Sequence, residues 1–201
     1  RGIRDIEEWY VSTLTRRDYV YRVFERQTEV ALANLQRLAA ALGDRVQVTL
    51  VTGTDFGAQS SAFISPQSYR DLYQPFHRAI NEWVHKHTAW KTFMHSCGAV
   101  GELIPDFIAA GFDILNPVQV TAAGMIPATL KERYGEQLVF WGGGVDTQRT
   151  LPFGTPEEVR DGHQHVGQGA EGDLARDRLA GQRHVGDQRV EVAGRVGVAA
   201  P

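Results

Sequence analysis

His95 and Cys97, which are separated by one serine, are the residues of this 201-residue chain best suited to bind a metal ion. At the end of a strand, an imidazole and a thiolate at this spacing can reach one ion, and sulfur with imidazole suits zinc. A zinc site needs at least one more protein ligand, and no second cysteine is present to supply it. The alternative, a buried thiol beside a hydrogen-bonded histidine, is the more common situation for an isolated His-x-Cys pair.

Two aspartates that lie near glycines are candidate catalytic residues. Asp55 lies within the segment 53–57, where its carboxylate could bind a cationic substrate group or act as a general acid or base. Asp146 follows closely after a run of three glycines, where it could orient a ligand. Each aspartate could instead accept hydrogen bonds from backbone amides of its own turn. Catalysis and turn formation therefore both remain open for these two residues.

Five further positions are candidate substrate-binding residues. The side-chain amides of Asn116 and Gln119 could hydrogen-bond a substrate, although an asparagine before a proline is also ordinary turn chemistry. The glycines Gly142, Gly143 and Gly144 permit close approach of a ligand to the backbone, and the amides that follow could bind an anion. The segment lacks the Gly-Lys-Ser/Thr and G-x-G-x-x-G patterns, so it predicts no nucleotide site.

The elements expected to position these residues alternate between strands and helices. Runs of apolar and β-branched residues predict four strands, at residues 46–52, 91–94, 113–116 and 138–141. Apolar residues at helical spacing, with caps such as Ser65 and Thr155 and the stop signal Gly43, predict the helices. These helices are expected at about residues 5–14, 16–42, 66–87, 100–110, 127–134 and from 155 onward.

Four strand–helix units in succession predict an α/β fold with a parallel sheet and right-handed crossovers. An open doubly wound sheet and a (β/α)8 barrel both fit this pattern, and since a barrel needs about 250 residues, the chain would supply half of one. The carboxyl ends of parallel strands form the active face. Because they follow strand ends, Asp55, His95, Cys97, Asn116 and Asp146 are expected to lie together on that face.

The overall composition gives no reason to expect a nucleic-acid or membrane partner. The formal net charge of −3 provides no attraction for nucleic acid or for an anionic membrane. No apolar run approaches the length that spans a bilayer and no signal peptide begins the chain, so we expect a cytoplasmic protein. The single cysteine excludes a disulfide within the chain. Because Arg1 stands inside sequence that reads as helical, we interpret the chain as a fragment.

Residues 161–201 differ abruptly in composition from the rest of the chain. They include no Phe, Trp, Tyr, Ile, Met, Lys, Ser, Thr, Asn or Cys. The ten residue types that occur there can all be encoded by codons beginning with G or C, as expected for a GC-rich gene translated out of frame. We interpret this segment as a frameshifted or disordered tail, with a low-complexity linker as the alternative. No metal role is assigned to His163, His165 or His184.

In order along the chain, the loop motifs resemble those of the uroporphyrinogen decarboxylase superfamily. The matching segments are GTDFG (53–57), ISPQSY (64–69), HSCG (95–98), DFIAAG (106–111), DILNPVQ (113–119), FWGGGVDTQ (140–148) and LPFGTPEE (151–158). The resemblance implies the C-terminal half of a (β/α)8 TIM barrel over residues 1–160, followed by the non-native-looking tail at 161–201.

The resemblance implies one of two activities. Uroporphyrinogen decarboxylase, an enzyme of porphyrin biosynthesis, removes carboxyl groups from a tetrapyrrole without a cofactor, whereas corrinoid-dependent methyltransferases use zinc to activate a thiol. In the methyltransferase branch a His-x-Cys pair, matched here by His95 and Cys97, supplies two zinc ligands, and a later cysteine, expected beyond residue 160, supplies another. The His-Ser-Cys-Gly motif favours this branch. The catalytic aspartate of the decarboxylases lies in the absent N-terminal half, so Asp55 does not correspond to it.

We therefore expect the full-length parent to be an enzyme of this superfamily, a lyase or a transferase, with a tetrapyrrole or corrinoid substrate or a corrinoid-protein partner. Zn²⁺ is its expected cofactor if it is a methyltransferase, and no cofactor is expected if it is a decarboxylase. The parent is expected to be a homodimer, and this chain alone to be inactive. The alternatives are a zinc-dependent cobalamin methyltransferase proper and a catalytically dead remnant that only binds.

Overall fold

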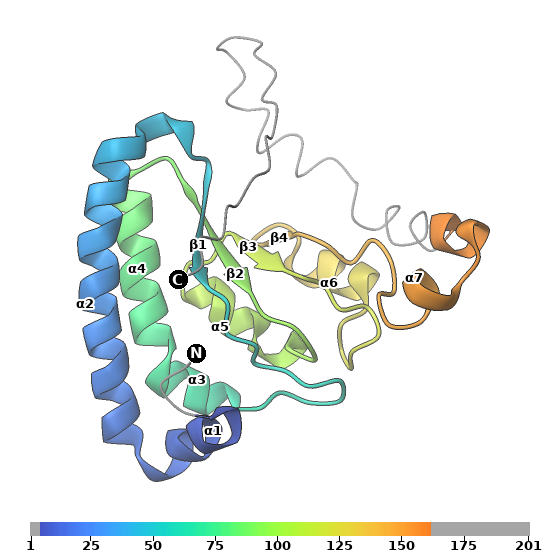
Figure 1. The fold of residues 1–201 in the computed structure, drawn as a ribbon, viewed down its shortest axis with the longest axis horizontal. Helices are drawn as coiled ribbons and strands as arrows, with labels where there is room; N and C mark the ends of the chain where they lie inside the picture. The colour runs from blue at the N-terminus through green and yellow to red at the C-terminus, as the bar shows by residue number, and fades with distance from the viewer. Residues whose placement is uncertain (1–4, 162–201) are drawn as a thin grey trace, which may run out of the picture.

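The computed structural model describes residues 5–161, so apart from Asp161 the expected tail lies outside the described residues. Four strands form one sheet in which every neighbouring pair is parallel, as the sequence predicted (Figure 1). They are β1 (Val48–Thr52), β2 (Lys91–His95), β3 (Ile114–Asn116) and β4 (Val139–Phe140). Their spatial order follows the sequence, as in part of a (β/α)8 barrel, whereas a doubly wound sheet reverses its strand order at a switch point.

Helices flank the strands at the predicted places, and the short helix α7 (Thr150–Phe153) is an addition that the sequence did not predict. They are α1 (Ile6–Thr15), α2 (Arg17–Leu42), α3 (Pro66–Leu72), α4 (Gln74–His87), α5 (Ile104–Ala109), α6 (Pro127–Tyr134) and α7 (Thr150–Phe153), with 3-10 turns η1 (Gly43–Arg45) and η2 (Gly101–Leu103). A further helical segment covers residues 156–161. It begins with a capping box, because Thr155 Oγ1 accepts from the Glu158 amide and the Glu158 carboxylate accepts from the Thr155 amide. Thr155 is therefore the cap that the sequence predicted.

Two helices differ from the sequence-based expectation, and a proline explains each difference. The helix expected at 66–87 is divided at Tyr73 into α3 and α4, because Pro75 has no amide hydrogen and its ring clashes with the preceding turn. The helix expected from residue 100 begins as the 3-10 turn η2. Its α-helical part starts only at Ile104, where Pro105 occupies a first-turn position that needs no amide hydrogen.

The two faces of the sheet have different surroundings. Met94 on β2 and Leu115 on β3 are fully buried in the main hydrophobic core with the helices. Because side chains alternate along a strand, Phe93 and its β1 partner Leu50 point to the opposite face, where Leu50 is 63% exposed. His95 shares this face with Phe93, because it lies two residues further along β2. The end of β2 therefore presents its histidine on the more open side of the sheet.

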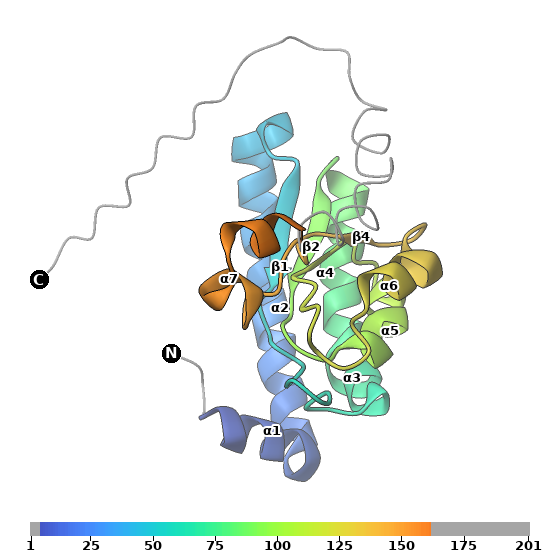
Figure 2. The same cartoon turned by 90° about the vertical axis from the view of Figure 1, so that its right-hand side faces the viewer.

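Helices and aromatic side chains hold the loop that follows β1. The long helices α2 and α4 pack side by side next to the sheet, and in Figure 2 α7 lies across the strands from α5 and α6. The Phe56 ring, in the loop after β1, packs at 5.5 Å from Tyr69 and 4.9 Å from Tyr73 between ring centroids.

Within residues 5–161, no helix combines the length and the apolar character needed to cross a bilayer.

Candidate metal centre

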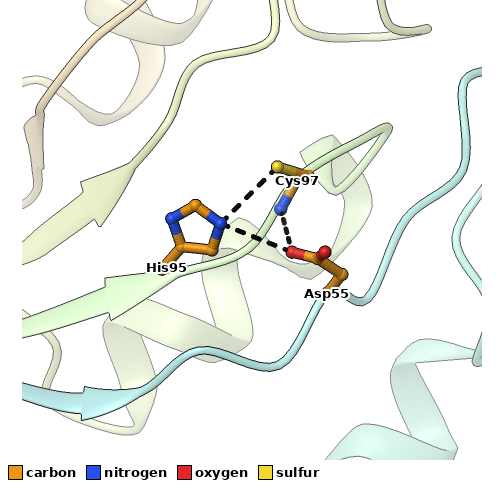
Figure 3. Close-up of side chains that lie close together, drawn as sticks. All are labelled: Asp55, His95 and Cys97. Carbon is orange, nitrogen blue, oxygen red and sulfur yellow. Dashed lines mark hydrogen bonds and ion pairs between the residues drawn. The ribbon is translucent and has the colours of Figure 1, made fainter. Parts of the chain in front are cut away.

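Asp55, His95 and Cys97 form a compact cluster at the carboxyl ends of β1 and β2 (Figure 3). His95 is the last residue of β2, Cys97 follows two residues later, and Asp55 lies in the loop after the neighbouring strand β1. His95 Nε2 lies 3.6 Å from Cys97 Sγ and 3.7 Å from Asp55 Oδ1. One ligand atom from each of the three side chains lies within 4.8 Å of the other two.

The separations of His95 Nε2 from the other two ligand atoms fit a tetrahedral zinc ion. With zinc–ligand bonds of about 2.0–2.3 Å, two ligands at the tetrahedral angle are separated by about 3.4 Å for nitrogen and oxygen and about 3.6 Å for nitrogen and sulfur. The observed separations of 3.7 Å and 3.6 Å are close to these values. Catalytic zinc sites combine three protein ligands with one open position. The residues present therefore fit zinc, with Asp55 as a third donor that the sequence analysis did not consider as a ligand.

Close backbone contacts between the first two loops hold the cluster together. The Cys97 amide donates a hydrogen bond to Asp55 Oδ1 at 2.8 Å. Gly57 and Gly98 approach so closely that a Cβ atom on Gly98 would lie 2.1 Å from the Gly57 carbonyl oxygen. Gly98 also has a φ of +86°, a conformation that favours glycine. The glycine beside Cys97 is therefore needed for the two loops to meet.

Two further contacts fix the loop that carries Asp55. Ser96 is buried, and its Oγ accepts a hydrogen bond from the Phe56 amide at 2.9 Å. The hydroxyl of Tyr10, on α1, donates a hydrogen bond to the backbone carbonyl of Asp55. Burial, with smaller contributions from Tyr73 and Asp55, raises the pKa of Tyr10 above its ordinary value. The phenol therefore keeps its proton at neutral pH and remains a donor.

The thiol of Cys97 is not activated by the protein alone. Burial and the Asp55 carboxylate raise the pKa of Cys97 above its ordinary value. In the absence of a cation, the cluster therefore favours a protonated thiol at neutral pH. A bound divalent cation reverses this preference, because a thiol that coordinates the ion loses its proton.

Asn116 and Gln119, the predicted substrate-binding amides, both have partners within the protein. Asn116 Oδ1 lies 2.8 Å from His95 Nδ1, and Asn116 Nδ2 donates to the Trp141 carbonyl at 2.8 Å. Gln119 Oε1 accepts a hydrogen bond from the Gly98 amide at 2.9 Å. Both side chains thus support the candidate metal centre, and their contact with a substrate stays a prediction.

Gln59 and Gln148 belong to this region, and the sequence analysis did not assign either of them a role. Gln59 Oε1 accepts hydrogen bonds from the Nε2 atoms of Gln119 and Gln148, each at 3.0 Å. These three side chains tie together the loops that follow β1, β3 and β4. Their positions shortly after strand ends were the available signal, but the pairing of one loop with another is not visible in the sequence.

Asp146 lies in the loop after β4 and bonds to its own turn. Its Oδ1 accepts from the amides of Gln148 at 2.8 Å and Arg149 at 3.2 Å. This is the turn-forming alternative considered from the sequence, and a catalytic role for Asp146 stays a prediction. Four of the five residues expected on one face contact one another directly: Asp55, His95, Cys97 and Asn116. Asp146 is linked to them only indirectly, because it bonds to the amide of Gln148, whose side chain reaches Gln59 in the loop after β1.

The glycines after β4 pack against the loop after β3. Gly142 and Gly143 have φ values of +116° and +81°, which few other residues adopt. A Cβ atom on Gly143 would lie 2.8 Å from the Val118 side chain, and one on Gly142 would lie 3.5 Å from Pro117. Gly144 is half-buried in the same turn. The close approach that these glycines permit is therefore made by the protein's own chain, and ligand binding by them stays a prediction.

A parallel sheet with sequential strand order, and a polar cluster where its strands end, is typical of the (β/α)-barrel class of enzymes. The model of the uroporphyrinogen decarboxylase (URO-D) family matches residues 1–175, and the chain belongs to this family. The match continues past residue 160, where the composition changes. Neither the curated proteins nor the solved structures contain a match to the chain. The family generally comprises enzymes, both decarboxylases and methyltransferases.

Proposed function

We propose that this chain carries the metal centre of a methyltransferase that moves a methyl group from a corrinoid to a thiol, in the C-terminal half of a (β/α)8 barrel. Zn²⁺ is bound by Asp55, His95 and Cys97. The observation that carries the proposal is the convergence of one nitrogen, one sulfur and one oxygen donor, in which His95 Nε2 lies from each of the other two at a separation close to that of a tetrahedral zinc site. Membership of a family that includes methyltransferases supports it.

Bound zinc would supply a substrate thiolate at neutral pH, because coordination lowers the pKa of a thiol. In the transfer, the thiolate sulfur donates an electron pair to the methyl carbon and the carbon–cobalt bond breaks. The electron pair of that bond stays with the corrinoid, and the thiol proton passes to solvent. The reaction is therefore balanced without an oxidant or a reductant.

In this scheme the chain's own residues bind the zinc ion and orient its ligands. His95 binds through Nε2, and Asp55 holds the Cys97 backbone by accepting its amide hydrogen. Phe93 and Trp141 pack edge to face, with ring centroids 5.6 Å apart, on the face of the sheet that His95 shares. Trp141 is also largely exposed, so these rings offer an apolar surface beside the metal centre for the methyl donor.

Metal analysis with matched histidine variants tests this proposal. We expect about one zinc per purified chain, and less than about a tenth of that in Cys97→Ser and His95→Gln, because each removes a ligand. His85→Gln is the matched control, since His85 also contacts an aspartate, Asp113 at 2.7 Å, but lies on α4 away from the cluster. This control should keep its zinc. A metal-free chain that decarboxylates uroporphyrinogen would contradict the proposal and favour the decarboxylase activity.

A further inference from the structure

Asn116 contacts the candidate metal centre without being one of its ligands. It lies on β3 directly beside His95, its register partner on β2. Its Oδ1 is 2.8 Å from His95 Nδ1, the ring nitrogen that faces away from Cys97 and Asp55. The side chain therefore sits behind the imidazole, where it can influence how the ring presents its other nitrogen.

The orientation of the Asn116 amide is set by Trp141, the residue directly after β4. Its Nδ2 donates to the carbonyl of Trp141 at 2.8 Å, and a carbonyl oxygen can only accept. Trp141 is itself held beside β3, because its amide donates to the Leu115 carbonyl at 2.9 Å. A flipped amide would place two oxygen acceptors against each other. The oxygen of Asn116 must therefore face His95.

An oxygen acceptor at 2.8 Å requires a proton on His95 Nδ1. In the neutral ring, Nε2 then carries a free lone pair. Nε2 is also the atom that faces Cys97 Sγ at 3.6 Å and Asp55 Oδ1 at 3.7 Å. With the opposite tautomer, an Nε2–H group would donate into the cluster and make it an ordinary hydrogen-bonded structure. The tautomer of His95 thus decides whether the cluster can accept a cation.

We propose that Asn116 is a positioning residue, which fixes His95 in the tautomer protonated at Nδ1 and directs the Nε2 lone pair toward Cys97 and Asp55. Two neighbouring strands and the residue that follows a third contribute, through the His95 ring, the Asn116 amide and the Trp141 carbonyl. The part of this inference that concerns metal binding rests on the proposed function. The tautomer itself is a property of the metal-free chain. Groups that orient a metal-binding histidine in this way change metal affinity by about 10–100-fold when removed.

Long-range ¹H–¹⁵N NMR spectra of the full chain, labelled with ¹⁵N-histidine, report the tautomer directly. The spectra are recorded without metal at about pH 8, where an ordinary histidine is neutral. We expect the proton of His95 on Nδ1. His85 is the internal reference: its Nε2 lies 2.7 Å from the Asp113 carboxylate, so its proton is expected on Nε2. Loss of the corresponding signals in His95→Gln and His85→Gln assigns them.

Two substitutions of Asn116 complete the test. Asn116→Asp keeps an oxygen acceptor beside Nδ1 and loses the donor to the Trp141 carbonyl, so His95 should stay protonated at Nδ1. Asn116→Leu removes the acceptor, so the ring should shift toward the Nε2–H form and zinc affinity should fall about 10–100-fold. If Asn116→Leu does not fold, the wild-type tautomer decides the question.

A wild-type His95 protonated at Nε2 would overturn the inference. An Asn116→Leu chain that folds with its tautomer and its zinc affinity unchanged would overturn it equally. A wild-type chain protonated at Nδ1 that binds no zinc would overturn the proposed metal centre and leave the role of Asn116 in fixing the tautomer intact. The two proposals can therefore fail separately.

Discussion

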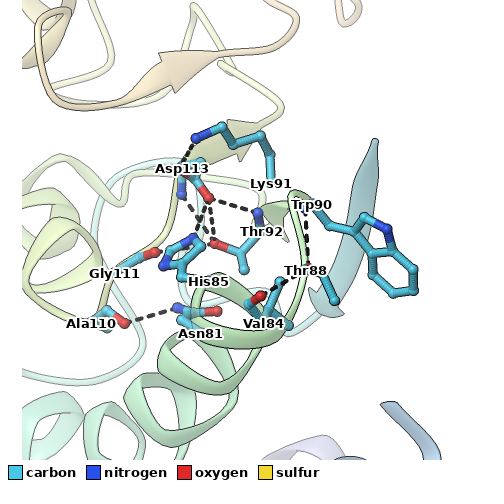
Figure 4. Close-up of polar contacts among 10 residues, drawn as sticks. All are labelled: Asn81, Val84, His85, Thr88, Trp90, Lys91, Thr92, Ala110, Gly111 and Asp113. Carbon is cyan, nitrogen blue, oxygen red and sulfur yellow. Dashed lines mark hydrogen bonds and ion pairs between the residues drawn. The ribbon is translucent and has the colours of Figure 1, made fainter. Parts of the chain in front are cut away.

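A cluster that contains a histidine and an aspartate lies at each end of β2, but the two clusters differ in their hydrogen bonding. At the amino end, the cluster of His85, Lys91, Thr92 and Asp113 is saturated with donors (Figure 4). Asp113 Oδ2 accepts from the Thr92 amide at 2.8 Å, the Thr92 hydroxyl at 3.0 Å and His85 Nε2 at 2.7 Å. Its Oδ1 lies 3.4 Å from the Lys91 ammonium group. This amino-end cluster is complete without any ligand.

The carboxyl-end cluster, formed by Asp55, His95 and Cys97, has the opposite balance. Three potential electron-pair donors converge there, and the Cys97 amide supplies the hydrogen bond to Asp55. Asn116 Oδ1 pairs with His95 Nδ1, the ring nitrogen that points away from the cluster. A cluster with more lone pairs than protons is suited to a cation. The balance of donors and acceptors, rather than the residue types, distinguishes the two ends.

The pKa shifts follow the same distinction. Burial alone would raise the pKa of Asp113, but the hydrogen bonds from Thr92 and His85 and the nearby charge of Lys91 outweigh it and lower the pKa overall. For Cys97, burial and the Asp55 carboxylate act in the same direction and raise the pKa. The amino-end cluster thus stabilises the ionised carboxylate of Asp113. The carboxyl-end cluster instead disfavours the thiolate of Cys97 until a cation is bound.

The largest expected effect is a crossed result from replacing each aspartate. Asp113→Ala should lower the free energy of unfolding by about 3 kcal/mol, because Thr92 and His85 lose their acceptor, while zinc binding stays unchanged. Asp55→Ala should lower it by about 1 kcal/mol, the value of one hydrogen bond, and should abolish zinc binding. Urea denaturation and zinc titration of both variants measure this. Equal effects of the two substitutions on zinc affinity would remove the distinction between the clusters.

A third histidine, His77, sharpens the comparison because burial alone shifts its pKa. Burial lowers the pKa of His77 to about 3, and its Nδ1 lies 3.0 Å from the Tyr69 hydroxyl. Between about pH 6.5 and pH 3 the unfolded chain binds a proton that the folded chain does not, so stability falls as pH decreases, by about 1.4 kcal/mol per unit. His77→Gln should reduce this slope in urea denaturation. An unchanged slope in His77→Gln would contradict this account.

A smaller effect is expected from Tyr10, which holds the loop of Asp55 from outside the cluster. Tyr10→Phe removes the hydrogen bond to the Asp55 carbonyl and keeps the ring, which packs on Phe63 at 5.1 Å. The loss should be about 1 kcal/mol, which corresponds to about a fivefold weaker zinc affinity if the loop alone is loosened. Isothermal titration with zinc tests this, with Tyr21→Phe, on the exposed side of α2, as the control. Equal losses in both variants would exclude a specific role for Tyr10.

Much of the fold could be predicted from the sequence, because local signals determine it. The β-branched runs predicted the four strands, and Gly43 and Thr155 marked a helix end and a helix start as predicted. The divisions at Pro75 and Pro105 were missed although both prolines are visible. In each case the apolar periodicity continues through the proline and indicates one helix. Pro75 divides that helix because its ring clashes with the preceding turn, whereas Pro105 fits the first turn and marks where α5 begins.

The candidate site could be located from the sequence but its internal pairings could not. Parallel strands bring their carboxyl ends together, so the convergence of Asp55 with His95 and Cys97 follows from the topology. That Asp55 supplies a third donor, and that Asn116 faces a histidine rather than solvent, depends on which loop crosses which. Those contacts join residues 21 to 42 positions apart, and they leave no local pattern.

The most direct test of the central claim is zinc K-edge X-ray absorption of the zinc-loaded chain, compared with Cys97→Ser. The account predicts one sulfur at about 2.3 Å and a shell of nitrogen and oxygen at about 2.0–2.2 Å, including the imidazole signature of one histidine. Cys97→Ser should lose the sulfur and, if it retains any zinc, bind it only through nitrogen and oxygen. A wild-type spectrum without sulfur, or with two sulfurs from zinc shared between two chains, would contradict a centre formed by Asp55, His95 and Cys97 of one chain.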